Sequence, residues 1–233
     1  MTELTRRQLI GTGAAAGGAL ALGSAPGWAR KRPRLLREAS FPAGVIAGEP
    51  RLHGGVLWTQ LGAGERPGLL ELEVAADPGF ARVVHRERVA ALAQRDLTAR
   101  APVYSKRIRP GERFWYRFSS RTGSSPVGRF TARRPADSAE PARIGFFSCQ
   151  DWGSGYYTAH AALAREDCDA IVCLGDYVYE TNTSGSVPER EDRTSAAESG
   201  ECELLSEYRA KYRLYRTDPA LRAMQSSASL LAT

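Results

Sequence analysis

The sequence predicts two structural regions: an all-β sandwich of fibronectin or immunoglobulin type, and after it the first βαβ portion of an α/β layered domain. Two observations lead to this expectation. Residues 39–136 contain short β-type segments at regular spacing, with turn residues between them and no convincing helix. Residues 142–233 instead alternate apolar strand segments with amphipathic helical segments, which is typical of parallel sheets.

Residues 1–29 have the pattern of an export signal. Arg6 and Arg7 precede a short, weakly apolar run at 11–23, and the Gly-Trp-Ala sequence at 27–29 is a candidate cleavage site. The paired arginines indicate the twin-arginine (Tat) pathway. We therefore expect the Tat translocase as a partner during export, and a periplasmic or extracellular location. The apolar run is too short for a stable membrane span.

Residues 30–38 form a basic arm, and most of the positive charge lies there and in the signal. The chain carries a net charge of +6, but residues 1–38 hold seven Lys and Arg against two Glu. The remaining residues carry a net charge of only +1. The high isoelectric point therefore comes from the N-terminus, and we expect no nucleic-acid partner.

The expected sandwich domain, 39–136, has alternating aromatic residues near its end. Strands are expected at 55–59, 69–75, 81–89, 101–108 and 127–131. Between the last two, Phe114, Tyr116 and Phe118 alternate with less apolar residues. Such an aromatic face could bind carbohydrate, but it is more typical of a core. Residues 137–141 are polar, end in a proline and are expected to be the linker.

The partial α/β domain, 142–233, begins with a strand at 143–148, a helix at 155–166 and a strand at 171–174. Parallel neighbours joined in this way place their carboxyl ends at one edge of the sheet, which brings Cys149 close to Asp176. Tyr179 follows three residues later. A thiolate, a carboxylate and a phenolate can converge on one cation. The alternative is a strand end with a capping aspartate and buried Cys and Tyr side chains.

The rest of this domain offers fewer candidates for chemistry. Residues 181–200 are polar and predict a solvated loop, and 203–216 predict an amphipathic helix that packs tyrosines on the core. His160 is expected at the surface. Cys173 is expected to be a buried apolar residue, whereas a disulfide between Cys168 and Cys202 is left open.

Three motifs resemble the PhoD-like alkaline phosphatase family of metallophosphoesterases. They are Ser-Cys-Gln-Asp at 148–151, Gly-Asp-Tyr-Val-Tyr-Glu at 175–180, and Tyr-Arg-x-x-Tyr-x-x-Tyr at 208–215. In the sandwich region the resemblance is looser, because Glu49 stands where the family usually has Asp and Gln60 where it usually has Arg. The resemblance implies that residues 142–233 are part of a metallophosphatase domain.

The resemblance also implies an activity and a metal site. The family hydrolyses phosphate esters by a metal-activated hydroxide, as alkaline phosphatases or phosphodiesterases, without a side-chain nucleophile. Carried over residue by residue, Cys149, Asp176 and Tyr179 are metal ligands that bind Fe(III), and Asp176 also reaches Ca(II). The expected substrate partner is a phosphate ester. Whether it is a monoester, a diester or a phospholipid does not follow from these motifs.

The family's later ligand motifs, which begin with Asp-Asp-His-Glu after a strand, have no match here. Residues 229–233 stand where that strand would begin. We therefore expect a truncated chain with an exposed sheet edge and apolar face, and with little or no hydrolysis by itself. The alternative function is that of a non-catalytic secreted β-sandwich protein with a vestigial phosphatase domain.

Overall fold

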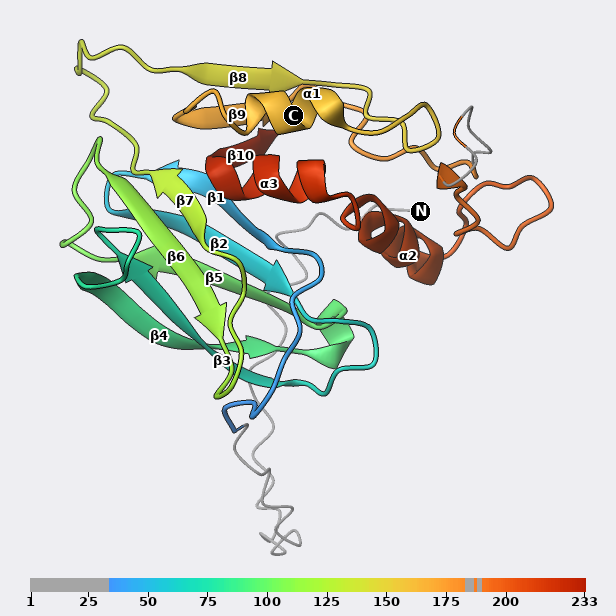
Figure 1. Cartoon of the computed structure of the whole chain (residues 1–233), viewed down its shortest axis with the longest axis horizontal. Coiled ribbons are helices and arrows are strands. Elements are labelled where there is room, and N and C mark those ends of the chain that lie inside the picture. The colour runs from blue at the N-terminus through green and yellow to red at the C-terminus, as the bar shows by residue number, and fades with distance from the viewer. Residues whose placement is uncertain (1–33, 183–186, 188–189) are drawn as a thin grey trace, which may run out of the picture. The chain divides into compact units, whose positions relative to one another are not determined.

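The fold is known from a computed structural model, which describes residues 34–182, 187 and 190–233. The expected export signal at 1–29 and the first four residues of the basic arm, 30–33, lie outside the described residues. Residues Pro33–Thr233 form one compact unit. The unit is mostly β-structure in two sheets with few helices (Figure 1). Among the described helices, none combines the length and apolarity needed to cross a membrane.

The smaller sheet has four antiparallel strands in the order β4-β3-β6-β7. Its strands are β3 (Gly68–Ala75), β4 (Val83–Ala91), β6 (Arg113–Ser119) and β7 (Gly128–Thr131). The alternating aromatics Phe114, Tyr116 and Phe118 of β6 are all fully buried, so they form core and not a carbohydrate platform. The period-two pattern therefore gave the correct face of this strand.

The larger sheet has six strands in the order β5-β2-β1-β10-β9-β8, and it spans both halves of the sequence. Its strands are β1 (Val45–Arg51), β2 (Gly54–Gln60), β5 (Thr98–Tyr104), β8 (Ile144–Phe147), β9 (Ala170–Cys173) and β10 (Ser229–Ala232). β1, β2 and β5 are antiparallel, whereas β10, β9 and β8 pair in parallel. β10 joins the two groups because it also pairs in parallel with β1, through Ala47 and Ser229.

The helices all lie in the second half of the chain. They are α1 (Thr158–Leu163), which lies between β8 and β9 in the sequence, α2 (Leu205–Tyr215) and α3 (Pro219–Ser227). A short 3-10 turn, η1 (Ala93–Arg95), stands between β4 and β5. α3 was not expected from the sequence. It packs against α1, β1, β7 and β10, and Figure 1 shows it crossing in front of the larger sheet.

Two separate apolar cores fill the unit. One consists of buried residues between Ala39 and Ala132, and it lies between the two sheets. The other consists of buried residues between Trp152 and Ala228, with the three helices and the parallel strands around it. The two cores meet along the β1–β10 pairing and not through shared apolar side chains.

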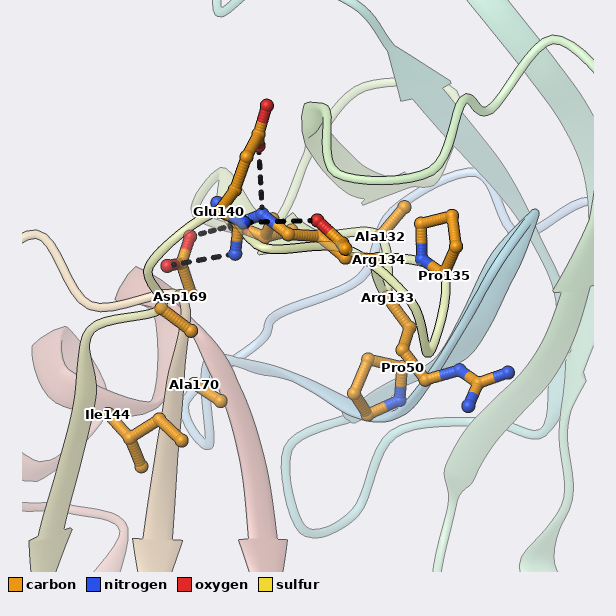
Figure 2. Close-up of a pocket in the computed structure, with 12 residues that line it drawn as sticks. Pro50, Ala132, Arg133, Arg134, Pro135, Glu140, Ile144, Asp169 and Ala170 are labelled. Atoms are coloured by element: carbon orange, nitrogen blue, oxygen red, sulfur yellow. Dashed lines mark hydrogen bonds and ion pairs between the residues drawn. The ribbon is translucent and has the colours of Figure 1, made fainter.

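The connection between β7 and β8 is fixed by charged side chains. Arg134 lies 3.3 Å from Glu140 and 3.4 Å from Asp169, as Figure 2 shows. Asp169 also accepts hydrogen bonds from the Thr131 hydroxyl and from the backbone amide of Arg143. The polar stretch that the sequence gives as a linker, 137–141, lies within this connection.

The expected exposed edge is confirmed at β8, which is the last strand of the larger sheet. Ile144 and Phe146 project from it with 59% and 69% of their surface accessible, and Leu174 beyond β9 is 54% accessible. The sheet differs from the expectation in one respect, because β10 adds a third parallel strand to the expected two.

Candidate metal centre

The candidate ligands Cys149 and Asp176 follow neighbouring parallel strands. β8 and β9 run in parallel with Phe147 paired to Cys173, so both chains leave the sheet at the same edge. The two loops are then hydrogen-bonded to each other, because the Cys149 amide donates to Gly175 O at 3.3 Å and the Gln150 amide donates to Asp176 O at 3.2 Å. The topology therefore holds the two residues side by side, as the sequence predicted.

Both residues have a backbone conformation that side-chain-bearing residues rarely adopt. The φ angles are +55° at Cys149 and +50° at Asp176, in the left-handed region. A non-glycine residue there costs on the order of 1 kcal/mol, and such strain is concentrated at functional sites. The inter-loop hydrogen bonds maintain this conformation and turn both side chains out of the sheet edge.

Two of the candidate ligand atoms lie next to one carboxylate oxygen of the third candidate ligand. Cys149 Sγ lies 3.4 Å from Asp176 Oδ2, and the Tyr179 hydroxyl lies 3.3 Å from the same Oδ2. Cys149 and Asp176 are exposed, whereas Tyr179 is half-buried. The structure thus brings together all three residues that the sequence singled out.

The environment of Tyr179 favours its neutral form when no cation is present. Desolvation raises the pKa of the Tyr179 phenol, and the hydrogen bond with Cys149 and the negative charge of Asp176 raise it further. A phenolate at this position therefore requires a strong nearby positive charge. A trivalent cation provides such a charge.

The donor set fits a ferric ion in its chemistry but is incomplete. A thiolate, a carboxylate and a phenolate offer three negative charges to one cation, whereas a hard ion such as Ca(II) would use only the carboxylate oxygens. In the part of the chain that the structure describes, no three His, Cys, Asp and Glu side chains cluster as a metal site would require. Three donor side chains would fill only part of the coordination shell of such an ion.

Gln150 fixes the loop that carries Cys149. Its buried side chain donates to Tyr177 O at 2.7 Å and accepts from His160 Nε2 at 2.9 Å, while its own carbonyl accepts from the Tyr157 hydroxyl at 2.9 Å. Gln150 thus ties the Cys149 loop to both the Asp176 loop and α1. Since its polar atoms are satisfied within the core, the loop is held rigidly.

His160 is buried, so the expectation of a surface histidine was wrong. Only 7% of its surface is accessible, and its ring stacks on Tyr157 with centroids 5.0 Å apart. Burial lowers the pKa of His160, against a smaller opposing effect of the Asp218 charge. The neutral ring can then donate from Nε2 to Gln150. The burial was missed because α1 is shorter than the helix expected at 155–166 and carries His160 on its inner face.

The hydroxyl of Tyr215 binds both loops that carry the candidate ligands. Its hydroxyl accepts from the backbone amide of Trp152 at 3.3 Å and from the backbone amide of Tyr179 at 3.5 Å. Trp152 belongs to the loop after Cys149, and Tyr179 belongs to the loop after Asp176. One buried phenol at the end of α2 therefore bridges the two loops.

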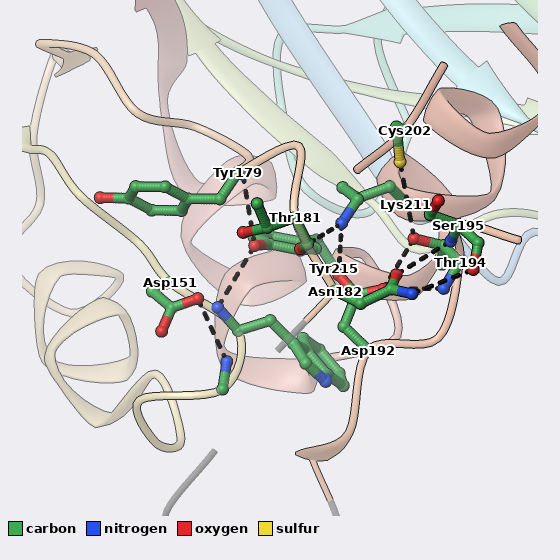
Figure 3. A network of polar contacts seen from close by, with 12 residues as sticks. Asp151, Tyr179, Thr181, Asn182, Asp192, Thr194, Ser195, Cys202, Lys211 and Tyr215 are labelled. Atoms are coloured by element: carbon green, nitrogen blue, oxygen red, sulfur yellow. Dashed lines mark hydrogen bonds and ion pairs between the residues drawn. The ribbon is translucent and has the colours of Figure 1, made fainter. Parts of the chain in front are cut away.

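The loop after Tyr179 is anchored by a buried ion pair (Figure 3). Lys211 of α2 donates to Thr181 O and to Asp192 Oδ2, both at 2.8 Å, and the side chains of Lys211 and Asp192 are fully buried. The expectation of a solvated loop at 181–200 was therefore wrong at its charged centre, since Arg190 is buried as well. These residues were missed because sequence spacing does not reveal which distant charges pair.

The cysteines form no disulfide. Cys149, Cys168, Cys173 and Cys202 are all free thiols, which settles the open question of a Cys168–Cys202 bond. Cys173 is fully buried, as expected. Its thiol donates to Gly175 O, the carbonyl that also accepts from the Cys149 amide.

Helix α3 was missed, although the start of this helix can be recognised in the sequence. Asp218 caps α3 by accepting from the amides of Ala220 and Leu221, and Pro219 occupies the first helical position. An aspartate followed by proline is a favourable helix start. This signal in the sequence would have predicted α3, although not the ion pair that Asp218 makes with Arg190.

Both halves of the chain match known proteins. The family model described as the PhoD-like phosphatase N-terminal domain matches residues 27–133, and the PhoD-like phosphatase model matches 144–233. Alkaline phosphatase D of Bacillus subtilis (strain 168) is 30% identical over 203 residues, which are 83% of this chain and 34% of that protein. A solved structure of PhoD is similar with a TM-score of 0.72 and 28% identity, over 90% of this chain and 40% of that one.

These matches show the family of the chain and how much of a relative's length the chain covers. The chain spans about a third of the length of the curated relative that it matches. The two family models meet between residues 133 and 144, in the connection between β7 and β8. The two PhoD-like phosphatase models together match most of the chain, so the chain belongs to the PhoD-like phosphatase family.

Proposed function

We propose that this chain supplies the first metal ligands of a secreted, metal-dependent phosphoesterase of the alkaline phosphatase or phosphodiesterase type. The observation that carries the proposal is the convergence of Cys149 Sγ and the Tyr179 hydroxyl on Asp176 Oδ2. Family membership supports the proposed reaction class, and this convergence supports the proposed position of the metal site at the ends of β8 and β9. The corresponding fine architecture is a fibronectin-like or immunoglobulin-like sandwich followed by the first βαβ portion of a metallophosphatase.

The proposed resident ions are Fe(III), which Cys149, Asp176 and Tyr179 would hold, and Ca(II), which Asp176 would also reach. When bound, the ions would neutralise charge on the phosphate oxygens and activate water for attack on phosphorus. Further ligands must come from residues outside this set, because three donors leave the coordination shells open.

The chain's own residues prepare this site before any ion arrives. Gln150 and Tyr215 hold the two ligand loops in register, and Lys211 anchors the backbone at Thr181, two residues beyond Tyr179. The ligand atoms are therefore positioned by groups that are themselves buried and hydrogen-bonded. Asp176 is the central residue of the proposed site, because its carboxylate lies next to both other donors and can bridge two cations.

Export by the Tat pathway completes the proposal. A protein that must acquire Fe(III) or Ca(II) in a folded state suits a route that moves folded chains. Replacing both Arg6 and Arg7 with lysine should leave the protein in the cytoplasm, as judged by cell fractionation. Unchanged export of that variant would refute the Tat assignment.

The test of the activity uses an extended chain, in which the part of Bacillus subtilis alkaline phosphatase D that follows the aligned region is joined after Thr233. We expect the extended chain to hydrolyse p-nitrophenyl phosphate or bis-p-nitrophenyl phosphate, and a chelator to abolish that hydrolysis. Asp176→Asn should reduce turnover at least about a hundredfold, since an amide bridges cations poorly. The 233-residue chain should show little or no turnover.

Two outcomes would count against the proposal. One is strong, chelator-sensitive turnover by the 233-residue chain, which would mean that the site is complete without further ligands. The other is turnover of the extended chain that Asp176→Asn leaves unchanged. Circular dichroism of both variants separates loss of activity from loss of fold. If the extended chain does not fold, the binding of Fe(III) to the 233-residue chain, with and without Asp176→Asn, provides the same decision.

A further inference from the structure

A pocket lies between α2 and the strands β2 and β5, with a volume of about 340 Å³. The α2 side of the pocket consists of residues three or four positions apart, which therefore share one face of the helix. They are Leu205, Tyr208, Arg209, Tyr212 and, at the end of the helix, Arg216. The opposite wall consists of Trp58, Gln60, Arg95, Asp96 and Thr98.

The lining residues leave the pocket positively charged. Asp96 is the only carboxylate among them, and both of its oxygens are bound by residues other than the arginines of the pocket. Arg213 donates to Asp96 Oδ1 at 2.9 Å and to Oδ2 at 3.1 Å, and Gln60 donates to Oδ2 at 2.6 Å. The three lining arginines therefore have no carboxylate of the pocket to balance them.

Arg216 is a half-buried cation among aromatic rings. Its guanidinium lies 4.5 Å from the centroid of the Trp58 ring and 5.4 Å from that of Tyr212. It also hydrogen-bonds with the Tyr177 hydroxyl, which stays neutral because burial raises the pKa of that phenol. Since a guanidinium does not lose its proton in proteins, Arg216 brings a full positive charge to the pocket with only neutral groups around it.

Arg95 and Arg209 offer donors that a molecule in the pocket can reach. Arg95 is exposed and Arg209 is half-buried. Nη2 of Arg209 donates to Gln94 O at 3.1 Å, which fixes the direction of this side chain. Among the described residues, no side-chain nitrogen of Arg95 or Arg209 is buried without a partner, so their remaining N–H groups are accessible. Nε of Arg216 is buried, so this nitrogen is not a donor to the pocket.

We infer that this pocket binds a small organic anion, in which a phosphonate, phosphate or carboxylate group is attached to a ring. The oxyanion would accept hydrogen bonds from Arg95 and Arg209 and would be attracted by the charge of Arg216. The ring would lie against Tyr212 and Leu205, which are 37% and 65% accessible. The volume is at the lower end of the range of small-molecule sites.

This site goes beyond the proposed function and does not depend on it. None of the three proposed metal ligands lines the pocket. The two places are linked only indirectly, because Tyr177, the residue after Asp176, stacks on Tyr212 with ring centroids 5.7 Å apart. Binding can therefore be measured without any metal.

The test observes the indole N–H of Trp58 by two-dimensional ¹H–¹⁵N NMR of the 233-residue chain in the presence of a chelator. The signal is assigned by its disappearance in Trp58→Phe. Phenylphosphonate, benzoate, methylphosphonate and benzyl alcohol are titrated separately, and none of them contains a phosphate ester. We expect phenylphosphonate or benzoate to shift the signal with a Kd of about 1 mM or tighter. The tighter of the two identifies the oxyanion.

The other two probes separate the charge from the ring. Methylphosphonate should bind about tenfold more weakly than phenylphosphonate, because it lacks the ring that Tyr212 and Leu205 would cover. Benzyl alcohol has the ring but no charge, and it should not shift the Trp58 signal.

The variants identify the residues that bind the anion. Replacing both Arg95 and Arg209 with glutamine should weaken binding about tenfold or more. Arg100→Gln is the matched control, because Arg100 is a surface arginine of β5 with 52% of its side chain accessible and it does not line the pocket. This control and Asp176→Asn should both leave binding unchanged, the latter because it alters only the proposed metal centre. If the double variant does not fold, Arg95→Gln alone, at an exposed turn residue, should weaken binding about threefold.

The inference is overturned if neither phenylphosphonate nor benzoate shifts the Trp58 signal up to about 10 mM. It is also overturned if benzyl alcohol or methylphosphonate binds as tightly as the ring-bearing anions. Unchanged affinity in the folded arginine variants, or an equal loss in Arg100→Gln, would overturn it as well.

Discussion

Replacing Lys211 with methionine tests the part of the structure that the sequence least revealed. Lys211 and Asp192 form an ion pair in which neither side chain is accessible to solvent. Methionine keeps the length and apolar stem of lysine but removes the ammonium group. The change leaves Thr181 O and Asp192 Oδ2 without the donor that each now has.

The expected loss of stability follows from what remains around Asp192. Removing one partner of a buried pair costs about 3–5 kcal/mol, because the other charge stays buried and unpaired. Asp192 Oδ1 still accepts from the amide and the hydroxyl of Thr194, so part of its solvation is retained. We therefore expect a loss of about 3 kcal/mol, at the lower end of the range.

Urea unfolding followed by circular dichroism measures this loss. Arg193→Met is the matched control, because Arg193 pairs with Glu191 in the same loop but at the surface, with 81% of its side chain accessible. The control should change stability by less than about 1 kcal/mol. A double replacement, Lys211→Met with Asp192→Leu, should be less damaging than Lys211→Met alone. The reasoning is refuted if Lys211→Met costs no more than the control, or if the double variant is the least stable of all.

Two further predictions concern the fold. Burial lowers the pKa of His160, so below about pH 6.5 the unfolded chain takes up a proton that the folded chain does not. Stability should therefore decrease from about pH 7.5 to about pH 5, and His160→Gln should reduce that slope in urea titrations; an equal slope in both proteins would contradict the burial of this ring. The first core is formed entirely by residues between Ala39 and Ala132, so a fragment of residues 39–136 should show a cooperative thermal transition. A broad, non-cooperative melt of that fragment would mean that β10 is required to complete the sheet.

The sequence predicted the parts of the fold that depend on local pattern. The period-two aromatics of β6 gave the buried face, and turn residues gave strand limits to within a few residues. The placement of Cys149 beside Asp176 also followed from local pattern, because two parallel strands joined by a helix have only one favoured arrangement. The proximity of Cys149, Asp176 and Tyr179 was therefore expected from the sequence.

The features that could not be predicted from the sequence depend on contacts between residues that are far apart in the chain. Lys211 and Asp192 look like ordinary surface charges in the sequence, and only the fold places one against the other. His160 likewise looks exposed on the amphipathic helix expected at 155–166, and only the fold places it against Gln150. The insertion of β10 between β1 and β9 joins strands about 180 residues apart, and no local signal specifies such a pairing.

The central claim is that Tyr179 and Cys149 bind a ferric ion together with Asp176, and its most direct test is the visible spectrum of the extended chain purified with Fe(III). A phenolate or thiolate bound to Fe(III) gives a charge-transfer band, whereas a buried tyrosine or cysteine without metal gives none. We expect such a band, and we expect Tyr179→Phe to shift or weaken it with little loss of stability. Tyr104→Phe, at an exposed tyrosine of β5, should leave it unchanged. No visible band, or a band that neither Tyr179→Phe nor Cys149→Ser alters, would contradict the account.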